Sequence, residues 1–249
     1  MNDVTRQLRK RKSVRVFEER DLEEPLVQEI LESAVMAPTA GNQQLYTILR
    51  IRDAQILAEL ARLCDNQPFI ARGRLVLLFL ADCLKWQDAF RLAGCNPRNP
   101  GVGDLLLAVD DALIAAQNAV VAAESLGIGS CYIGDVMEHR EEMARLLDLP
   151  ETVFPAALLV MGYPAGQQRE REKPRRSPME QIVQENRYHR RTEGELRQML
   201  SNRCAEENYE AWMKAFCLRK YNSDFSREMT RSVAAYLRDF AGAENGTGG

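Results

Sequence analysis

Hydrophobic positions along this chain alternate between helical and strand-like spacing. A helical pattern begins at Pro25 and ends before Ala37-Pro38, and helical spacing returns over residues 54–64. Residues 45–51 are rich in aromatic and β-branched side chains, and residues 75–81 form a continuous apolar run short enough for a central strand. The first third of the chain therefore predicts two helices and two strands in alternation.

The most apolar segment covers residues 105–126, where polar residues such as Asp110 and Asp111 interrupt it, and the expected helix covers residues 104–126. A membrane span needs about 20 mostly apolar residues, so the interruptions favour a helix buried inside protein. Asp104 is expected to cap this helix and Gly127 to end it. The helix follows a polar, Pro- and Gly-containing stretch over residues 91–103, which is expected to be a mobile surface loop.

The pattern continues with strands over residues 128–134 and 154–162 and an amphipathic helix over 138–147. Beyond Arg175 the composition becomes polar and helical. We expect residues 1–175 to form a core, 176–241 a helical arm on the core or on a second subunit, and 242–249 a disordered tail. The arm carries aromatic residues that need a surface to pack on: Tyr209, Trp212, Phe216, Tyr221, Phe225, Tyr236 and Phe240.

Charge and composition narrow the function. The net charge of the 249 residues is −3, which argues against binding to nucleic acid or to an anionic membrane. The six cysteines lack C-x-x-C spacing, and the N-terminus lacks an export signal, so reduced thiols and a cytoplasmic location are expected. The two histidines suggest neither a metal site nor a nucleophile pair, and no dinucleotide or P-loop motif occurs. A bound cofactor would supply the chemistry that these side chains lack.

Two basic clusters are candidates for holding an anion. Arg11, Ser13 and Arg15 alternate along a stretch that, if extended, would point both guanidinium groups and the hydroxyl in one direction. Guanidinium groups match phosphate oxygens through paired hydrogen bonds. Lys173-Pro174-Arg175 could close on the same phosphate from the other end of the core. Composition alone favours the alternative of a solvated basic arm.

A glycine-punctuated strand and two loop amides complete the candidates. The glycines of residues 127–135 (GIGSCYIGD) could let the backbone approach a flat ligand closely. The side-chain amides of Asn42 and Gln67 could form hydrogen bonds with a ring edge that carries both donors and acceptors. The alternatives are a helix stop followed by a core strand, and ordinary turn residues.

In order along the chain, these segments resemble the nitroreductase family of flavoenzymes. The resemblance rests on residues 11–17 (RKSVRVF), on 37–44 (APTAGNQQ), on 127–134 and on the Lys-Pro-Arg at 173–175. It implies an α+β fold with a mixed sheet flanked by helices, a homodimer, and a long central helix at the dimer interface.

The resemblance also implies FMN as the cofactor, with NADPH or NADH as hydride donor in a ping-pong cycle and nitroaromatics or quinones as acceptors. No side chain would be needed as a catalytic acid or base, because the chemistry would take place at the flavin N5. Arg11, Lys12, Ser13 and Arg15 would contact FMN. Its phosphate and ribityl region would be held by Arg15, Lys173 and Arg175. Thr39, Asn42 and Gln67 would line the ring or the ribityl chain, and the backbone of Tyr132, Ile133, Gly134 and Asp135 would meet the flavin near N5 and O4.

Three other functions remain open from the sequence. The protein could be a dedicated flavin reductase that supplies reduced FMN to a partner, or a flavin-binding protein with no hydride donor. A nucleic-acid binder is disfavoured by the acidic total and the scattered aromatic residues.

Overall fold

The computed structural model describes residues 1–241. Contacts divide the chain into two compact units, one formed by Met1–Arg171 with the chain from Glu228 onward, the other by Glu172–Arg227. The division expected from the sequence, with a core ending at Arg175, stays a prediction. The tail over 242–249, expected to be disordered, lies outside the described residues.

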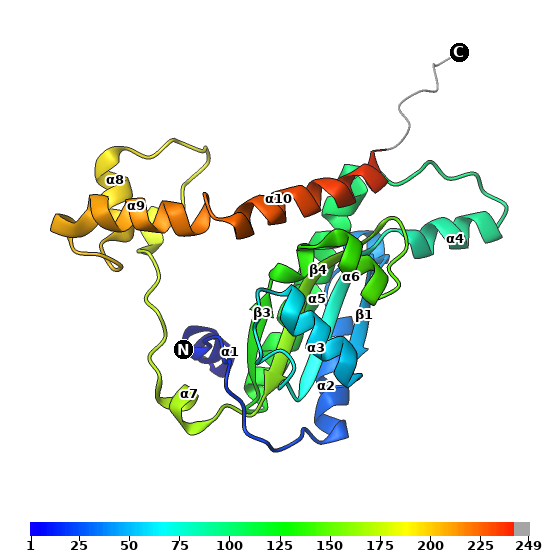
Figure 1. Cartoon of the computed structure of the whole chain (residues 1–249), viewed down its shortest axis with the longest axis horizontal. Coiled ribbons are helices and arrows are strands. Elements are labelled where there is room, and N and C mark those ends of the chain that lie inside the picture. The colour runs from blue at the N-terminus through cyan, green and yellow to red at the C-terminus, as the bar shows by residue number, and fades with distance from the viewer. Residues whose placement is uncertain (242–249) are drawn as a thin grey trace, which may run out of the picture. The chain divides into compact units, whose positions relative to one another are not determined.

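The first unit is built around a four-stranded sheet in which all neighbouring strands run antiparallel (Figure 1). In sheet order the strands are β1 (Tyr46–Ile51), β2 (Leu75–Asp82), β4 (Val153–Gly162) and β3 (Gly129–Ile133). Every residue of the central strands β2 and β4 is buried, which explains their continuous apolar sequences. The strands predicted from the sequence are confirmed.

The N-terminal segment adds to the β3 edge of this sheet. Ser13 forms a parallel bridge with Ser130, and the Val14 amide donates to the Ser130 carbonyl at 2.9 Å. Val14 is 3% exposed, whereas Arg15 is exposed, as expected for an extended segment with alternating faces. The four named strands form an antiparallel sheet rather than the expected mixed one, and this isolated bridge is parallel. The expected α+β fold is confirmed.

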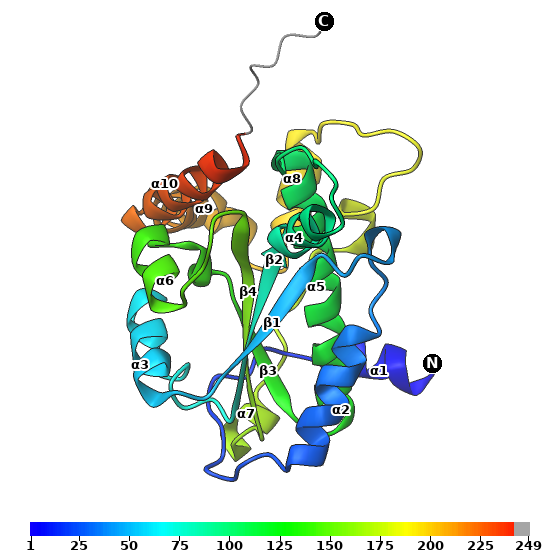
Figure 2. The same cartoon turned by 90° about the vertical axis from the view of Figure 1, so that its right-hand side faces the viewer.

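Helices cover both faces of the sheet (Figure 2). On one face lie α2 (Glu24–Val35) and α5 (Val102–Ser125), and on the other lie α3 (Ala54–Leu63) and α6 (Arg140–Leu146). The remaining helices are α1 (Asp3–Lys10), α4 (Leu84–Leu92), α7 (Gly166–Glu170), α8 (Glu193–Leu200), α9 (Tyr209–Lys220) and α10 (Asp224–Leu237). Short 3-10 turns are η1 (Ala40–Asn42), η2 (Asp135–Met137), η3 (Met179–Gln181), η4 (Glu206–Asn208) and η5 (Arg238–Phe240).

The long helix α5 has two different faces. Its inner face is a row of buried small residues, including Ala108, Ala112 and Ala119, that lets it lie close to α2 and the sheet. Its outer face exposes large apolar side chains, among them Leu106 and Leu107. By length and composition α5 could cross a membrane, but 44% of its most apolar stretch is buried inside the protein. The expectation of a core helix is confirmed.

Three local expectations need correction. Asp104 does not cap α5: Gly101 is the N-cap, and Asp104 stands three residues later, where its carboxylate accepts the Gly101 amide at 2.7 Å. The helix α4 ends at Leu92, inside the expected loop, so the loop itself covers only residues 93–101. The helix α6 begins at Arg140 rather than at 138, because His139 takes a left-handed φ of 50° that ordinary helices exclude.

The end of the chain returns to the first unit. Tyr236 and Phe240 are buried in its core, and the Tyr236 ring meets Phe154 edge-on at a centroid distance of 5.0 Å. These two aromatic residues therefore belong to the core of the first unit. In the second unit, Trp212 and Phe216 stack on each other at 4.9 Å.

Candidate functional site

Hydrogen bonds fix the N-terminal basic segment between β3 and residues 166–171. The Lys12 ammonium donates to the carbonyls of Arg169, at 2.8 Å, and of Arg171. The Arg171 guanidinium in turn donates to the Ser13 carbonyl. Lys12 is therefore committed to the backbone, and Arg171 is a further cation beside Ser13. No motif marks Arg171 in the sequence, although it stands in the charged run that precedes Lys173.

Arg11 is the most informative member of this segment. Its Nε and Nη2 atoms are buried, and no acceptor among the described residues bonds to them. The guanidinium carbon lies 5.8 Å from the centre of the Tyr132 ring, within cation–π range. Burying a charged donor without an acceptor is costly, so this position calls for an anionic or oxygen-rich ligand. The hydroxyl of Ser130 is buried and likewise without a partner.

Tyr132 and Cys131 point to opposite faces of β3. The Tyr132 hydroxyl donates to Gln117 of α5 at 3.3 Å, and burial raises the pKa of Tyr132 to about 12. Burial also raises the pKa of Cys131, against the opposing effect of Arg15 and a hydrogen bond with Ser13. Neither side chain is suited to donate or accept a proton near neutral pH.

Gln67 meets the turn that follows β3. Its amide nitrogen donates to the Cys64 carbonyl at 2.9 Å and to the Asp135 carboxylate. Ile133 is 3% exposed, whereas Gly134 is exposed at the end of the strand. The structure thus brings Gln67 and Asp135 together beside an exposed stretch of backbone.

Behind this turn lies a buried carboxylate. Glu138 is 4% exposed, and its Oε1 atom has no partner among the described residues. Burial, reinforced by Asp135, Asp65 and Glu228, raises the pKa of Glu138 to about 7. His139, the next residue, faces Glu228, with 3.4 Å between Nδ1 and Oε1. Glu138 is therefore a group that changes charge near neutral pH.

Thr39 and Asn42 occupy a loop at the other edge of the sheet. The loop leads into β1, three strands away from β3, which corresponds to about 14 Å at the usual strand spacing. Thr39 Oγ1 accepts the Gln44 amide at 3.0 Å, and Asn42 has a φ of 57°. Within one chain, the structure does not bring Thr39 and Asn42 to Arg11 and Tyr132.

The buried carboxylate of Asp111 on α5 holds this loop. It accepts the amides of Ala40 at 2.8 Å and of Leu45 at 3.1 Å. Asp111 is 3% exposed and had been noted only as an interruption of an apolar helix. That interruption was the available signal, because a buried carboxylate needs donors to compensate its desolvation.

A cavity of about 350 Å³ adjoins the same loop. It lies between α4, residues 93–101 and the start of α5, and its lining includes Gln43, Trp86, Phe90 and Arg98. Trp86 is fixed by its indole N–H, which donates to the Gln43 carbonyl at 2.8 Å. An aromatic wall with a few polar groups suits a flat small molecule.

Comparisons with known proteins agree with this geometry. The sequence model of the nitroreductase family matches residues 8–163, well over half of the chain. The chain belongs to the nitroreductase family. It is 30% identical to the FMN reductase [NAD(P)H] of Bacillus subtilis (strain 168), over 95% of this chain and 91% of that protein. It is 31% identical to the CR(VI) reductase of Pseudomonas sp. (strain G-1), over 94% of each.

Solved structures support the same assignment. The nitroreductase fold of this chain superposes on B. megaterium NfrA2 with a TM-score of 0.84 at 26% identity, covering 97% of this chain and 98% of that one. B. megaterium NfrA1 gives 0.82 at 28% identity, covering 94% and 98%. The resemblance predicted from the motifs is confirmed.

Lys173 and Arg175 are the remaining candidates in this nitroreductase. Both precede the first turn of the second compact unit, in a segment without regular secondary structure. Arg175 is exposed and Lys173 half-buried. Their role at a phosphate stays a prediction, as do the individual ligand contacts of the other site residues.

Proposed function

We propose that this chain is an FMN-dependent oxidoreductase that takes hydride from NADPH or NADH and passes electrons to small acceptors such as nitroaromatics or quinones. The observation that carries the proposal is Arg11 beside Tyr132: its buried Nε and Nη2 atoms find no acceptor in the part of the chain that the structure describes. Relatives named FMN reductase [NAD(P)H] and CR(VI) reductase match the chain over nearly its whole length.

The residues present fit FMN in charge and in hydrogen-bonding capacity. Arg11, Ser13 and Arg15 would hold the anionic end, with Lys173 and Arg175 completing the phosphate site. Gln67 and the backbone of residues 132–135 would bond the ring edge, whose atoms both donate and accept. When bound, FMN would supply the hydride acceptor that the chain's own side chains lack. Lys12 would act through the backbone it fixes, because its ammonium already has two carbonyl acceptors.

The active assembly is proposed to be a cytoplasmic homodimer. The outer face of α5 exposes Leu106, Leu107, Leu113 and Ile114, a run of large apolar side chains that a second copy would cover. Thr39 and Asn42 lie at the opposite sheet edge from Arg11. In the proposed dimer they would therefore contact the flavin held by Arg11 of the partner subunit, not the flavin held by Arg11 of the same subunit. The cavity beside Trp86 would then adjoin that shared site. Unpaired cysteines, three of them buried, fit a reducing compartment.

The test is the visible absorption spectrum of the purified protein before and after anaerobic addition of NADPH and then NADH. We expect flavin bands that bleach, and the nucleotide that bleaches them faster is the donor. A protein that binds FMN but bleaches with neither nucleotide would be a flavin-binding protein without a donor. A colourless protein that FMN cannot reconstitute would refute the proposal.

A flavin reductase is the second candidate, because the Bacillus subtilis relative carries that name. The two functions differ in their preferred acceptor. Steady-state turnover of free FMN should be compared with turnover of a nitrofuran and a quinone at equal concentration. A strong preference for free FMN would favour the flavin reductase.

A further inference from the structure

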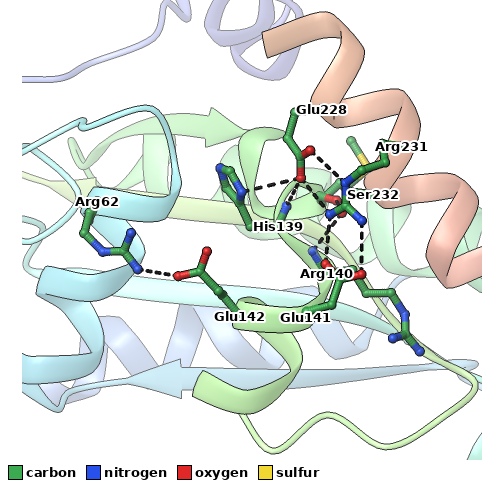
Figure 3. A network of polar contacts seen from close by, with 9 residues as sticks. Arg62, His139, Arg140, Glu141, Glu142, Glu228, Arg231 and Ser232 are labelled. Atoms are coloured by element: carbon green, nitrogen blue, oxygen red, sulfur yellow. Dashed lines mark hydrogen bonds and ion pairs between the residues drawn. The ribbon is translucent and has the colours of Figure 1, made fainter. Parts of the chain in front are cut away.

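The last helix of the chain is bonded directly to the backbone of the turn that precedes α6 (Figure 3). Ser232 of α10 is fully buried; its hydroxyl donates to the Met137 carbonyl at 2.7 Å and accepts the Arg140 amide at 2.9 Å. The Glu228 carboxylate, one turn earlier, accepts the His139 amide at 3.2 Å. Two side chains of α10 thus engage three consecutive peptide groups of the turn.

This turn needs partners from elsewhere. His139 is the N-cap residue of α6, yet its side chain makes no capping hydrogen bond, and its φ of 50° is unusual for a residue other than glycine. The first amides of a helix have no partner within the helix. The α10 side chains fill this role, so α6 is capped by a helix that is about 90 residues away in sequence.

The same peptide groups connect to the candidate flavin-binding backbone. One peptide group joins Met137 to Glu138. Its carbonyl, that of Met137, accepts the Ser232 hydroxyl, and its N–H, that of Glu138, donates to the Asp135 carbonyl at 3.0 Å. The preceding amide, that of Met137, donates to the Gly134 carbonyl at 3.0 Å. A short chain of hydrogen bonds therefore runs from α10 to Gly134 and Asp135, two of the four residues whose backbone is proposed to meet the flavin ring.

Ion pairs hold Glu228 in place for this contact. Arg231 donates to Glu228 at 2.8 Å and, through both terminal nitrogens, to Glu141 of α6 at 3.0 and 2.8 Å. Hydrogen bonding to Arg231 lowers the pKa of Glu141 to about 2 and also lowers that of Glu228. Both carboxylates consequently stay ionised at neutral pH.

We propose that Ser232 and Glu228 are positioning residues for the cofactor: they fix the backbone of Gly134 and Asp135, and thereby set the affinity for FMN and the reduction potential of the bound flavin. The inference rests on the proposed function. Backbone groups bonded to the ring stabilise its charged reduced form only when they are held in place. A change in the orientation of the turn therefore alters the potential as well as the binding.

The test compares Ser232→Ala with Asp239→Asn in the full-length protein. Asp239 also ties the end of the chain to α6, through the Arg140 guanidinium at 2.6 Å, but it does not touch the peptide groups of the turn. The measurements are the FMN dissociation constant, by fluorescence titration of the apoprotein, and the midpoint potential of the bound flavin. We expect about tenfold weaker binding and a shifted potential for Ser232→Ala. For Asp239→Asn we expect a change within about twofold and no shift.

Equal binding and equal potential in the Ser232→Ala and wild-type proteins would overturn the inference and leave the proposed function standing. A wild-type protein that takes up no FMN would overturn both. If Ser232→Ala does not fold, Glu228→Ala takes its place, because Glu228 is partly exposed and its loss frees only the His139 amide of the turn. A normal dissociation constant and potential in that variant would also overturn the inference.

Discussion

Replacing Asp111 by Asn tests whether one buried carboxylate holds the loop that carries Thr39 and Asn42. The Asp111 carboxylate accepts the Ala40 amide at 2.8 Å and the Leu45 amide at 3.1 Å, one on each oxygen. The side chain is 3% exposed, so water cannot replace either bond without a local opening. In Asp111→Asn one oxygen becomes an NH₂ group, which would face a backbone donor.

The expected cost follows from these two contacts. A hydrogen bond to a charged group contributes about 1.5–3 kcal/mol, and an unpaired buried donor costs about 1–3 kcal/mol. Losing one bond and weakening the other should therefore lower the free energy of unfolding by about 3 kcal/mol. For a domain of this size that corresponds to a fall in Tm of roughly 6–12 °C. Asp110→Asn is the matched control, because Asp110 is the neighbouring residue on α5 and is exposed.

The assay is thermal and urea unfolding of both variants and the wild type at one protein concentration, since a dimer's stability depends on concentration. Hydrogen exchange at the Ala40 and Leu45 amides adds a local measurement. Faster exchange at these amides should accompany the loss of stability. If Asp111→Asn unfolds like Asp110→Asn and its loop amides keep their protection, the role assigned to Asp111 is wrong.

Three further predictions concern the cofactor and pH. Arg11→Ala should weaken FMN binding at least about tenfold, measured by fluorescence titration, because a buried charge-assisted contact is lost; unchanged affinity would remove Arg11 from the site. Arg15→Ala combined with Lys173→Ala should release FMN on gel filtration while the dimer persists, and retention of the yellow colour would contradict the phosphate assignment. The pKa of Glu138 is raised from 4.5 to about 7, so its contribution to stability is full below pH 4.5 and is lost as pH rises through about 7. In Glu138→Gln, the free energy of unfolding measured by urea titration should fall less steeply as the pH rises from 4.5 to about 7. An equally steep fall in the variant and in the wild type would refute the burial argument.

The strands and most helices could be predicted from the sequence because their signals are local. The continuous apolar runs of β2 and β4, the Pro25 start of α2 and the Gly127 stop of α5 each depend on neighbouring residues. The family resemblance implied that Gln67 and Asp135 belong to one site, and the two side chains are in contact in the structure. The error at Asp104 was three positions: the N-cap is Gly101, and Asp104 accepts the Gly101 amide from the third helical position.

What the sequence could not provide is the set of contacts between distant residues. Asp111 bonds a loop about 70 residues before it, and Ser232 bonds a turn about 90 residues before it. Each looks in sequence like a polar residue on an otherwise apolar helix face, and a periodicity analysis treats such a residue as a break in the pattern. A fully buried polar side chain must nevertheless find partners, and backbone groups of irregular segments are the ones left without partners of their own. Polar interruptions on core-facing helix positions therefore indicate where a helix holds a loop, and in this protein both of those loops contain residues of the candidate site.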